Sequence, residues 1–267
     1  MKMCKSDLSK PRRGETLDSI FQGRLQIIQP KKGYRFSIDA VLLAGLTVVS
    51  PQDRIVDLGT GCGVIPLLLA SQQSVKHIIG IELQESLVSM AKRNVLINGF
   101  DHLISIVQAD LRRLEVARVD GPMDLVVSNP PYGKLLSGRL NPNSGKAIAR
   151  HELLATLGDV VRAAAQLLGQ KGRLAVIYPA RRLANLLVEV SSRGFAPKRL
   201  TLIHSTLDSE ARLVHLESVK GGGEELRPSN AAKEWSGTLQ ELEEKRAKIK
   251  RQIRHKITRI HGVCTPH

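Results

Sequence analysis

The sequence predicts a doubly wound α/β fold, with a mainly parallel sheet of seven strands that includes one antiparallel strand at its end. Short apolar strands and amphipathic helices alternate between residues 54 and 204. Such alternation is typical of a parallel sheet that is covered by helices on both faces. The last two predicted strands are joined by residues 205–210, which are mostly polar. A connection of this length suits an antiparallel pair and is too short for a crossover.

Local patterns place the individual elements. Ser37 is a candidate N-cap, Asn98-Gly99 is a typical helix end, and Gly169 should end the helix before it. In chain order we expect a strand at 25–28, a helix at 38–49, a strand at 54–58, a helix at 64–72, a strand at 77–82, a helix at 84–97, strands at 103–108 and 123–128, a helix at 152–168, a strand at 173–178, a helix at 180–193, and strands at 198–204 and 211–219.

The charge distribution indicates a polyanionic partner. The formal net charge is +15, and residues 245–259 hold eight Lys and Arg and no acidic residue. A nucleic acid is the natural partner for such a chain. We divide the chain into a basic N-terminal arm and short strand at 1–32, a main domain at 33–228, and a basic helical extension at 229–267. Within the arm, residues 1–16 should be mobile.

Composition also sets the expected compartment. The three cysteines lie far apart and form no C-x-x-C pattern, which argues against a disulfide or zinc framework. The first residues lack the apolar segment of a signal peptide. No apolar run approaches the roughly 20 residues of a membrane span. We therefore expect a cytoplasmic protein that has no metal site and no membrane contact.

A glycine turn at residues 57–63, read as DLGTGCG, joins a predicted strand to a predicted helix. Gly59, Gly61 and Gly63 permit positive φ and leave no Cβ above the turn. A polar ligand can therefore lie on the main-chain N–H groups at the mouth of the helix. The turn lacks the G-x-G-x-x-G spacing of the dinucleotide fingerprint. The alternative is a tight turn that binds no ligand.

Polar residues stand at the ends of four successive predicted strands. Asp57 ends the first, Glu82 the second, Asp110 follows the third, and Asn129-Pro130-Pro131-Tyr132 follows the fourth. The carboxyl ends of parallel strands form the ligand-binding edge of such sheets. An acid about 20 residues beyond a glycine turn is the expected ligand for ribose hydroxyls, which is the place of Glu82.

This set of motifs resembles the class I S-adenosylmethionine-dependent methyltransferases that modify planar amino groups, and the resemblance covers roughly residues 35–220. It implies a Rossmann-like methyltransferase fold with S-adenosyl-L-methionine as cofactor. Glu82 would bind the ribose hydroxyls, and Asp110 the adenine amino group beside Leu111. The residues implied in cofactor binding are Arg35, Ser37, Asp39, Asp57, Gly59, Gly61, Gly63, Glu82, Leu83, Asp110, Leu111 and Asn129.

The NPPY segment suits an amino group whose lone pair is delocalised into a ring or carbonyl. The side-chain oxygen of Asn129 and the carbonyl of Pro130 can accept its two N–H bonds and hold the nitrogen in line with the methyl donor. Pro130 and Pro131 stiffen the loop, and Tyr132 offers an aromatic face for an extruded base. We therefore take these four residues as the catalytic set.

Two further segments narrow the substrate. Residues 33–44 and 149–152 resemble the bacterial tRNA(Val) adenine-N6 methyltransferases, so adenine N6 in tRNA is the expected target. Three N-methyltransferase alternatives stay open, namely those of rRNA guanine N2, DNA adenine N6 and protein glutamine N5. A non-catalytic nucleic-acid-binding module on this fold is another. The basic helix predicted within 239–260 either contacts tRNA or presents a solvated face.

Overall fold

The computed structural model describes residues 10–20, 23–32, 35–72, 74–114, 119, 121–131, 155–206 and 209–232. The predicted basic helix of the C-terminal extension lies outside these residues. Elements follow one another in the order β1 (Glu15–Ile20), β2 (Leu25–Pro30), α2 (Ile38–Leu46), β3 (Arg54–Leu58), α3 (Val64–Gln72), β4 (His77–Glu82), α4 (Glu85–Ile97), β5 (Ile104–Gln108), η1 (Leu111–Arg113), β6 (Met123–Ser128), α6 (Leu157–Leu167), β7 (Leu168–Pro179), η3 (Ala180–Arg182), α7 (Leu183–Ser191), β8 (Phe195–His204), β9 (Ala211–Lys220) and β10 (Arg227–Ala232).

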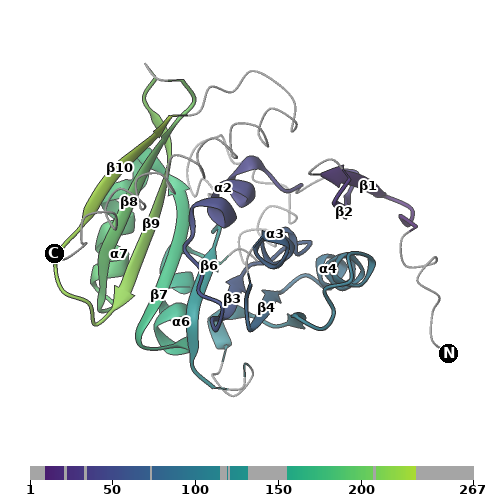
Figure 1. Ribbon diagram of the computed structural model, residues 1–267, viewed down its shortest axis with the longest axis horizontal. Helices are drawn as coiled ribbons and strands as arrows, with labels where there is room; N and C mark the ends of the chain where they lie inside the picture. Colours follow the sequence, from purple (N-terminus) through teal and green to yellow (C-terminus); the bar gives the residue numbers. More distant parts are fainter. Residues whose placement is uncertain are drawn as a thin grey trace, which may run out of the picture.

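The described residues form a sheet of eight strands and a separate two-stranded hairpin (Figure 1). The strand order in the large sheet is β10-β8-β9-β7-β6-β3-β4-β5. Only β9 among these strands runs antiparallel to its neighbours. This arrangement confirms the predicted fold class. In the same described ranges, no helix is long and apolar enough to span a membrane.

The sheet differs from the prediction at one edge. The antiparallel strand β9 lies between β7 and β8, so it is not at the end of the sheet. An eighth strand, β10, pairs parallel with β8 and crosses residue 228, where we expected the main domain to end. The sequence of β10 is RPSNAA, which has no apolar alternation, so its pairing with β8 could not be foreseen.

The N-terminal segment also differs from expectation. Residues 15 and 16, expected in a mobile arm, begin β1, which pairs antiparallel with β2 from Glu15 to Ile20. An ion pair between Glu15 and Arg93 of α4 further ties β1 to the main body. Both side chains are nearly buried. The arm prediction therefore fails for this part of the chain, because pairing with β2 orders a segment that is polar by itself.

Several boundaries shift, and capping explains two of them. Helix α2 ends at Leu46, three residues early, with Thr47 as its C-cap in an extended conformation, and the hydroxyl and the N–H of Thr47 both donate to the carbonyl of Leu43. Helix α6 begins at Leu157, where Thr156 and Asp159 form a capping box, and not near Glu152. Gly169 lies inside β7, which starts at Leu168. The helix predicted at 180–193 divides into η3 and α7.

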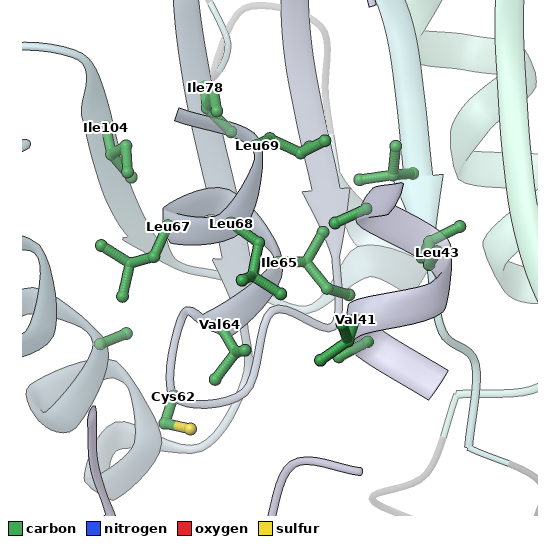
Figure 2. Packing of buried hydrophobic residues seen from close by; sticks show 14 of the residues in the cluster. Val41, Leu43, Cys62, Val64, Ile65, Leu67, Leu68, Leu69, Ile78 and Ile104 are labelled. Carbon is green, nitrogen blue, oxygen red and sulfur yellow. The ribbon is translucent and has the colours of Figure 1, made fainter. Parts of the chain in front are cut away.

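Two apolar clusters lie on opposite faces of the sheet, and adjacent strand residues alternate between them. Ile55 packs with α2, α3 and α4, whereas Val56 packs with α6 and α7. Figure 2 shows part of the first cluster, in which Leu68 and other side chains of α3 pack with Val41 and Leu43 of α2 and with Ile78 of β4. This two-sided burial explains why the strands near the centre read as continuous apolar runs.

Asn94 of α4 and Asn98, the C-cap of this helix, attach the hairpin to the main body through the same kind of contact. Asn94 accepts from the N–H of Ile28 (2.7 Å) and donates to its carbonyl (2.8 Å), and Asn98 does the same with Gln26 (2.9 and 2.7 Å). Asn94 is fully buried and also donates to the carbonyl of Cys62 in the glycine turn (2.9 Å). Asn94 therefore links β2, α4 and the turn.

We expect Asn94→Ala to lower the free energy of unfolding by about 2–4 kcal/mol, because it leaves buried backbone groups without partners. Asn98→Ala is the matched control, since it removes a similar pair of bonds where water can replace them, and should cost less than about 1 kcal/mol. Urea denaturation of both variants tests this. Equal losses in the two variants would contradict a special role for the buried contact.

Candidate functional site

A cavity of about 180 Å³ opens at the carboxyl ends of β3, β4 and β6. It brings together residues from all four predicted strand ends. Its lining comprises Leu58, Gly59, Gly61, Ile81, Glu82, Leu83, Gln84, Leu87, Ala109, Asp110, Leu111, Arg112, Asn129, Pro131, Ala155 and Val160.

The glycine turn is held by the neighbouring strand. The N–H groups of Gly59 and Thr60 both donate to the carbonyl of Ile81 (2.9 Å each), and that of Gly61 donates to Glu82 (3.0 Å). The N–H of Gly63 donates to Thr60. The expectation that a ligand lies on these N–H groups is therefore wrong for all four, because β4 and the turn itself supply their acceptors.

Glycine is nevertheless required in the turn. Gly59, Gly61 and Gly63 have φ values of 78°, 58° and 83°, which disfavour residues with a side chain. A Cβ on Gly63 would lie 3.2 Å from the Cβ of Ala91. A Cβ on Gly59 would meet no atom within 4 Å, and Gly59 lines the cavity. The missing side chain at Gly59 thus leaves space for a ligand.

Glu82 is the nearly buried carboxylate at the centre of the site. One of its oxygens accepts from the N–H of Gly61 (3.0 Å), and the other accepts from the N–H of Gln84 (2.9 Å). Each carboxylate oxygen has two lone pairs, so each can accept one further hydrogen bond. Glu82 lines the cavity and can therefore accept from two neighbouring hydroxyl groups of a ligand.

Asp57 lies beneath the turn and does not line the cavity. It is fully buried, and neither of its oxygens accepts a hydrogen bond from the described residues. Burial raises the pKa of Asp57 to about 7. The nearby hydroxyl of Thr60, which does not reach hydrogen-bond geometry, opposes this shift, and the charge of Glu82 adds to it.

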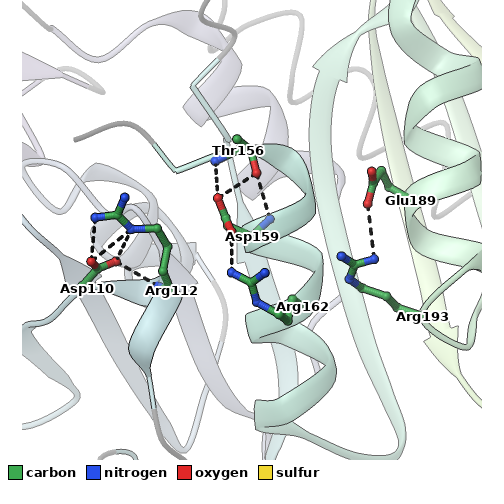
Figure 3. Close-up of polar contacts among 7 residues, drawn as sticks. All are labelled: Asp110, Arg112, Thr156, Asp159, Arg162, Glu189 and Arg193. Carbon is green, nitrogen blue, oxygen red and sulfur yellow. Dashed lines mark hydrogen bonds and ion pairs between the residues drawn. The ribbon is translucent and has the colours of Figure 1, made fainter. Parts of the chain in front are cut away.

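Asp110 is held by an arginine two residues further on (Figure 3). Its two oxygens accept from Nε of Arg112 (2.9 and 3.0 Å) and one also accepts from Nη2 (2.7 Å). The same carboxylate accepts from the N–H of Arg112 as the N-cap of η1. The hydrogen bonds from Arg112 keep the pKa of Asp110 below its usual range, so Asp110 is a fixed anion in the cavity wall.

The segment after β6 contributes Asn129 and Pro131 to the cavity wall, whereas Pro130 is buried. Ser128, just before it, donates to the carbonyl of Leu58 (2.8 Å), which joins the ends of β6 and β3. Tyr132 and the polar loop that follows lie outside the described residues.

Besides Asp57, four of the residues that the resemblance implied do not line the cavity. Arg35 forms an ion pair with Asp18 of β1 and donates to Thr16 and to the carbonyl of Pro30. Ser37 is the N-cap of α2 and accepts from the N–H of Asp39. Asp39 lies in the first turn of α2, and Gly63 immediately precedes α3. A direct role for these residues in binding stays a prediction.

Other residues that line the cavity were not predicted from the sequence. Gln84 and Arg112 each follow a predicted acid by two positions, and this proximity could have indicated them. Ala155 and Val160 come from the region that begins α6, and no local pattern links them to the strand ends.

The cavity suits a ligand that combines hydroxyl groups, a flat ring with an amino group, and an extended part over glycine. Glu82 can accept from hydroxyls, and Asp110, whose two oxygens already accept from Arg112, can accept from an amino group in place of one of those bonds. Leu83 and Leu111 offer apolar contact. The open space at Gly59 accommodates a chain that approaches the backbone. These features fit S-adenosylmethionine.

The raised pKa of Asp57 predicts a pH-dependent stability. The folded chain holds a proton on Asp57 between the unfolded pKa near 3.9 and about 7, so its cost to stability is absent below about pH 4 and complete above about pH 7. Asn cannot ionise, so Asp57→Asn should gain up to about 4 kcal/mol relative to wild type as pH rises from 4 to 7.5. Urea denaturation against pH measures this, with Asp101→Asn as an exposed control. A difference that does not change with pH would contradict the assignment.

Comparisons with known proteins agree with this geometry. The methyltransferase small domain family model matches residues 38–189. A Porphyromonas gingivalis protein named tRNA1(Val) (adenine(37)-N6)-methyltransferase is 30% identical over 197 residues, which cover 72% of this chain and 76% of that protein. A Tolumonas auensis protein of the same name is 26% identical over 194 residues, which cover 72% and 79%.

Solved structures share the fold. A methyltransferase from Pyrococcus furiosus superposes with a TM-score of 0.53 at 18% identity, covering 74% of this chain and 90% of that one. The tRNA m1G37 methyltransferase of M. jannaschii gives 0.53 at 12% identity, covering 79% and 58%. Because the family model spans more than half of the chain and the cavity fits the cofactor, the chain belongs to the methyltransferase small domain family and is an S-adenosylmethionine-dependent methyltransferase.

Proposed function

We propose that the protein transfers the methyl group of S-adenosylmethionine to N6 of an adenine in tRNA. The observation that carries this proposal is the position of Asn129, which lines the same cavity as Glu82 and Asp110. An amide at this point can face a planar amino group while the two carboxylates hold the cofactor. The names of the relatives support adenine N6 as the target and tRNA as the substrate.

We assign the cofactor contacts from the chemistry of the lining residues. Glu82 accepts from the ribose hydroxyls, and Asp110 accepts from the adenine amino group, with Leu83 and Leu111 against the ring. The methionine part passes over Gly59, where no Cβ intrudes. When bound, S-adenosylmethionine supplies an electrophilic methyl group. The chain then has to position the acceptor nitrogen in line with it.

Asn129 and Pro130 provide that positioning. The amide oxygen of Asn129 and the carbonyl of Pro130 accept the two N–H bonds of the target amino group. These bonds orient the nitrogen and stabilise the positive charge that develops on it as its lone pair forms the new bond. The amino group loses its proton after transfer, so no strong base is needed. Stacking of the target base on Tyr132 stays part of the proposal.

A tRNA substrate accords with the net charge of +15. It also places the protein in the cytoplasm as part of this proposal. The decisive experiment is methylation of unmodified tRNA transcripts, followed by mass spectrometry of the digested nucleosides. We expect N6-methyladenosine to form only when protein and S-adenosylmethionine are both present. Formation of N2-methylguanosine, or methylation of a protein and of no tRNA, would refute the proposal.

We expect Asn129→Ala to reduce the rate of methyl transfer by 100-fold or more, on the order of the loss of one transition-state hydrogen bond in other enzymes. Affinity for S-adenosylhomocysteine should stay within about twofold of wild type, because Asn129 is assigned to the target and not to the cofactor. Single-turnover assays and calorimetry measure the two quantities. Wild-type turnover in this variant would show that the segment is only structural.

A further inference from the structure

Three arginines gather beside the cavity on its β7 side. Arg181 and Arg182 belong to η3, which directly follows β7, and Arg212 lies near the start of β9. Since β9 runs antiparallel to β7, with Leu213 opposite Pro179, its start lies at the carboxyl end of β7. Segment η3 lies against β9. Arg181, Arg182 and Arg212 thus lie together at the carboxyl end of β7, and we call these three residues the arginine shelf.

The shelf is close to the target-binding residue. Ser128 of β6 pairs with Val176 of β7, so Asn129 is level with Ile177, only a few residues before η3. Neighbouring strands lie about 4.8 Å apart and rise about 3.3 Å per residue. The backbone of Arg181 is therefore roughly 10–15 Å from that of Asn129. This distance is within reach of the nucleotides next to a base held by Asn129.

The side chains of the shelf arginines have no protein partners among the described residues, unlike the three arginines drawn in Figure 3. In Figure 3, Arg112 pairs with Asp110, Arg162 with Asp159 and Arg193 with Glu189. The side chains of Arg181, Arg182 and Arg212 form no hydrogen bond or ion pair with the residues that the structure describes. Arg181 and Arg212 are exposed, and Arg182 is partly exposed. Their charges are thus available to an external anion.

The local backbone adds to this positive field. Pro179 precedes η3 and Arg182 precedes α7, and neither side chain accepts a capping hydrogen bond. The first turns of η3 and α7 contain no acidic residue. The partial positive charge at the start of α7 is therefore not neutralised locally. Glu210, an exposed acid two residues before Arg212, is the carboxylate nearest to the shelf in sequence.

We propose that the arginine shelf binds phosphates of the RNA strand that flanks the target nucleotide. This inference rests on the proposed function, because it assumes that the anion is the RNA substrate. Arginine suits the task, since its guanidinium can donate two parallel hydrogen bonds to one phosphate. Such contacts position the strand without reading its sequence. The shelf should therefore set RNA affinity and leave the choice of base to the cavity.

The test measures tRNA dissociation constants at several KCl concentrations. The single variant Arg181→Ala is compared with Lys76→Ala. The control removes one exposed charge just before β4, at the amino-terminal ends of the parallel strands and so on the side of the sheet away from the cavity. The plot of log affinity against log salt should become shallower by about 0.7–0.9 for Arg181→Ala and should not change for Lys76→Ala. The triple Ala variant of the shelf should lose about tenfold or more in affinity at 150 mM KCl. Its affinity for S-adenosylhomocysteine should equal that of wild type.

The outcomes separate this inference from the proposed function. If wild type binds and methylates tRNA but the triple variant keeps the same affinity and salt slope, the shelf assignment is wrong and the proposed function stands. If wild type does not bind tRNA, both are wrong. A triple Lys variant, which keeps the charges, should recover most of the lost affinity. Failure of this recovery, together with lost cofactor binding, would indicate a structural role for the shelf.

Discussion

The carboxylate of Glu82 connects the end of β4 to the glycine turn after β3, and the rest of the site depends on this connection. Together with the carbonyl of Ile81, it accepts the N–H groups of Gly59, Thr60 and Gly61. On the other side, Asn94 holds the carbonyl of Cys62. The turn is thus fixed by the sheet and by α4 before any ligand arrives. Its open side is a surface without Cβ atoms, bordered by a carboxylate with spare acceptor capacity.

The site separates charge of opposite sign within a strongly basic chain. Asp57, Glu82 and Asp110 lie at the carboxyl ends of the first three parallel strands that the sequence predicts, and Arg112 keeps Asp110 ionised. A cavity lined by carboxylates favours a cofactor that carries a positive sulfonium. The proposed arginine shelf lies outside this cavity, where a polyanionic substrate would approach. Negative charge thus faces the positively charged cofactor, and positive charge faces the polyanionic substrate.

The central strands and the site edge could be predicted because their signals are local. The strands 54–58, 77–82 and 123–128 have the predicted bounds, since burial on both faces requires continuous apolar runs. Strands β1 and β10 could not be predicted, because neither pattern is apolar and both depend on pairing with a neighbour. The acceptors of the N–H groups in the turn could not be predicted either, because the carbonyl of Ile81 belongs to another strand. The hydrogen bonds from the guanidinium of Arg112 to Asp110 depend on the rotamers of both side chains, and the two-residue spacing alone does not determine these rotamers.

Calorimetric titration of S-adenosylhomocysteine into wild type, Glu82→Gln and Glu82→Ala tests the central role of Glu82 most directly. We expect Glu82→Ala to lose about 1–3 kcal/mol of binding free energy, because a charged acceptor is removed from both the turn and the ligand. Glu82→Gln, which keeps one acceptor oxygen, should lose less. An unchanged affinity in a folded Glu82→Ala variant would contradict the account.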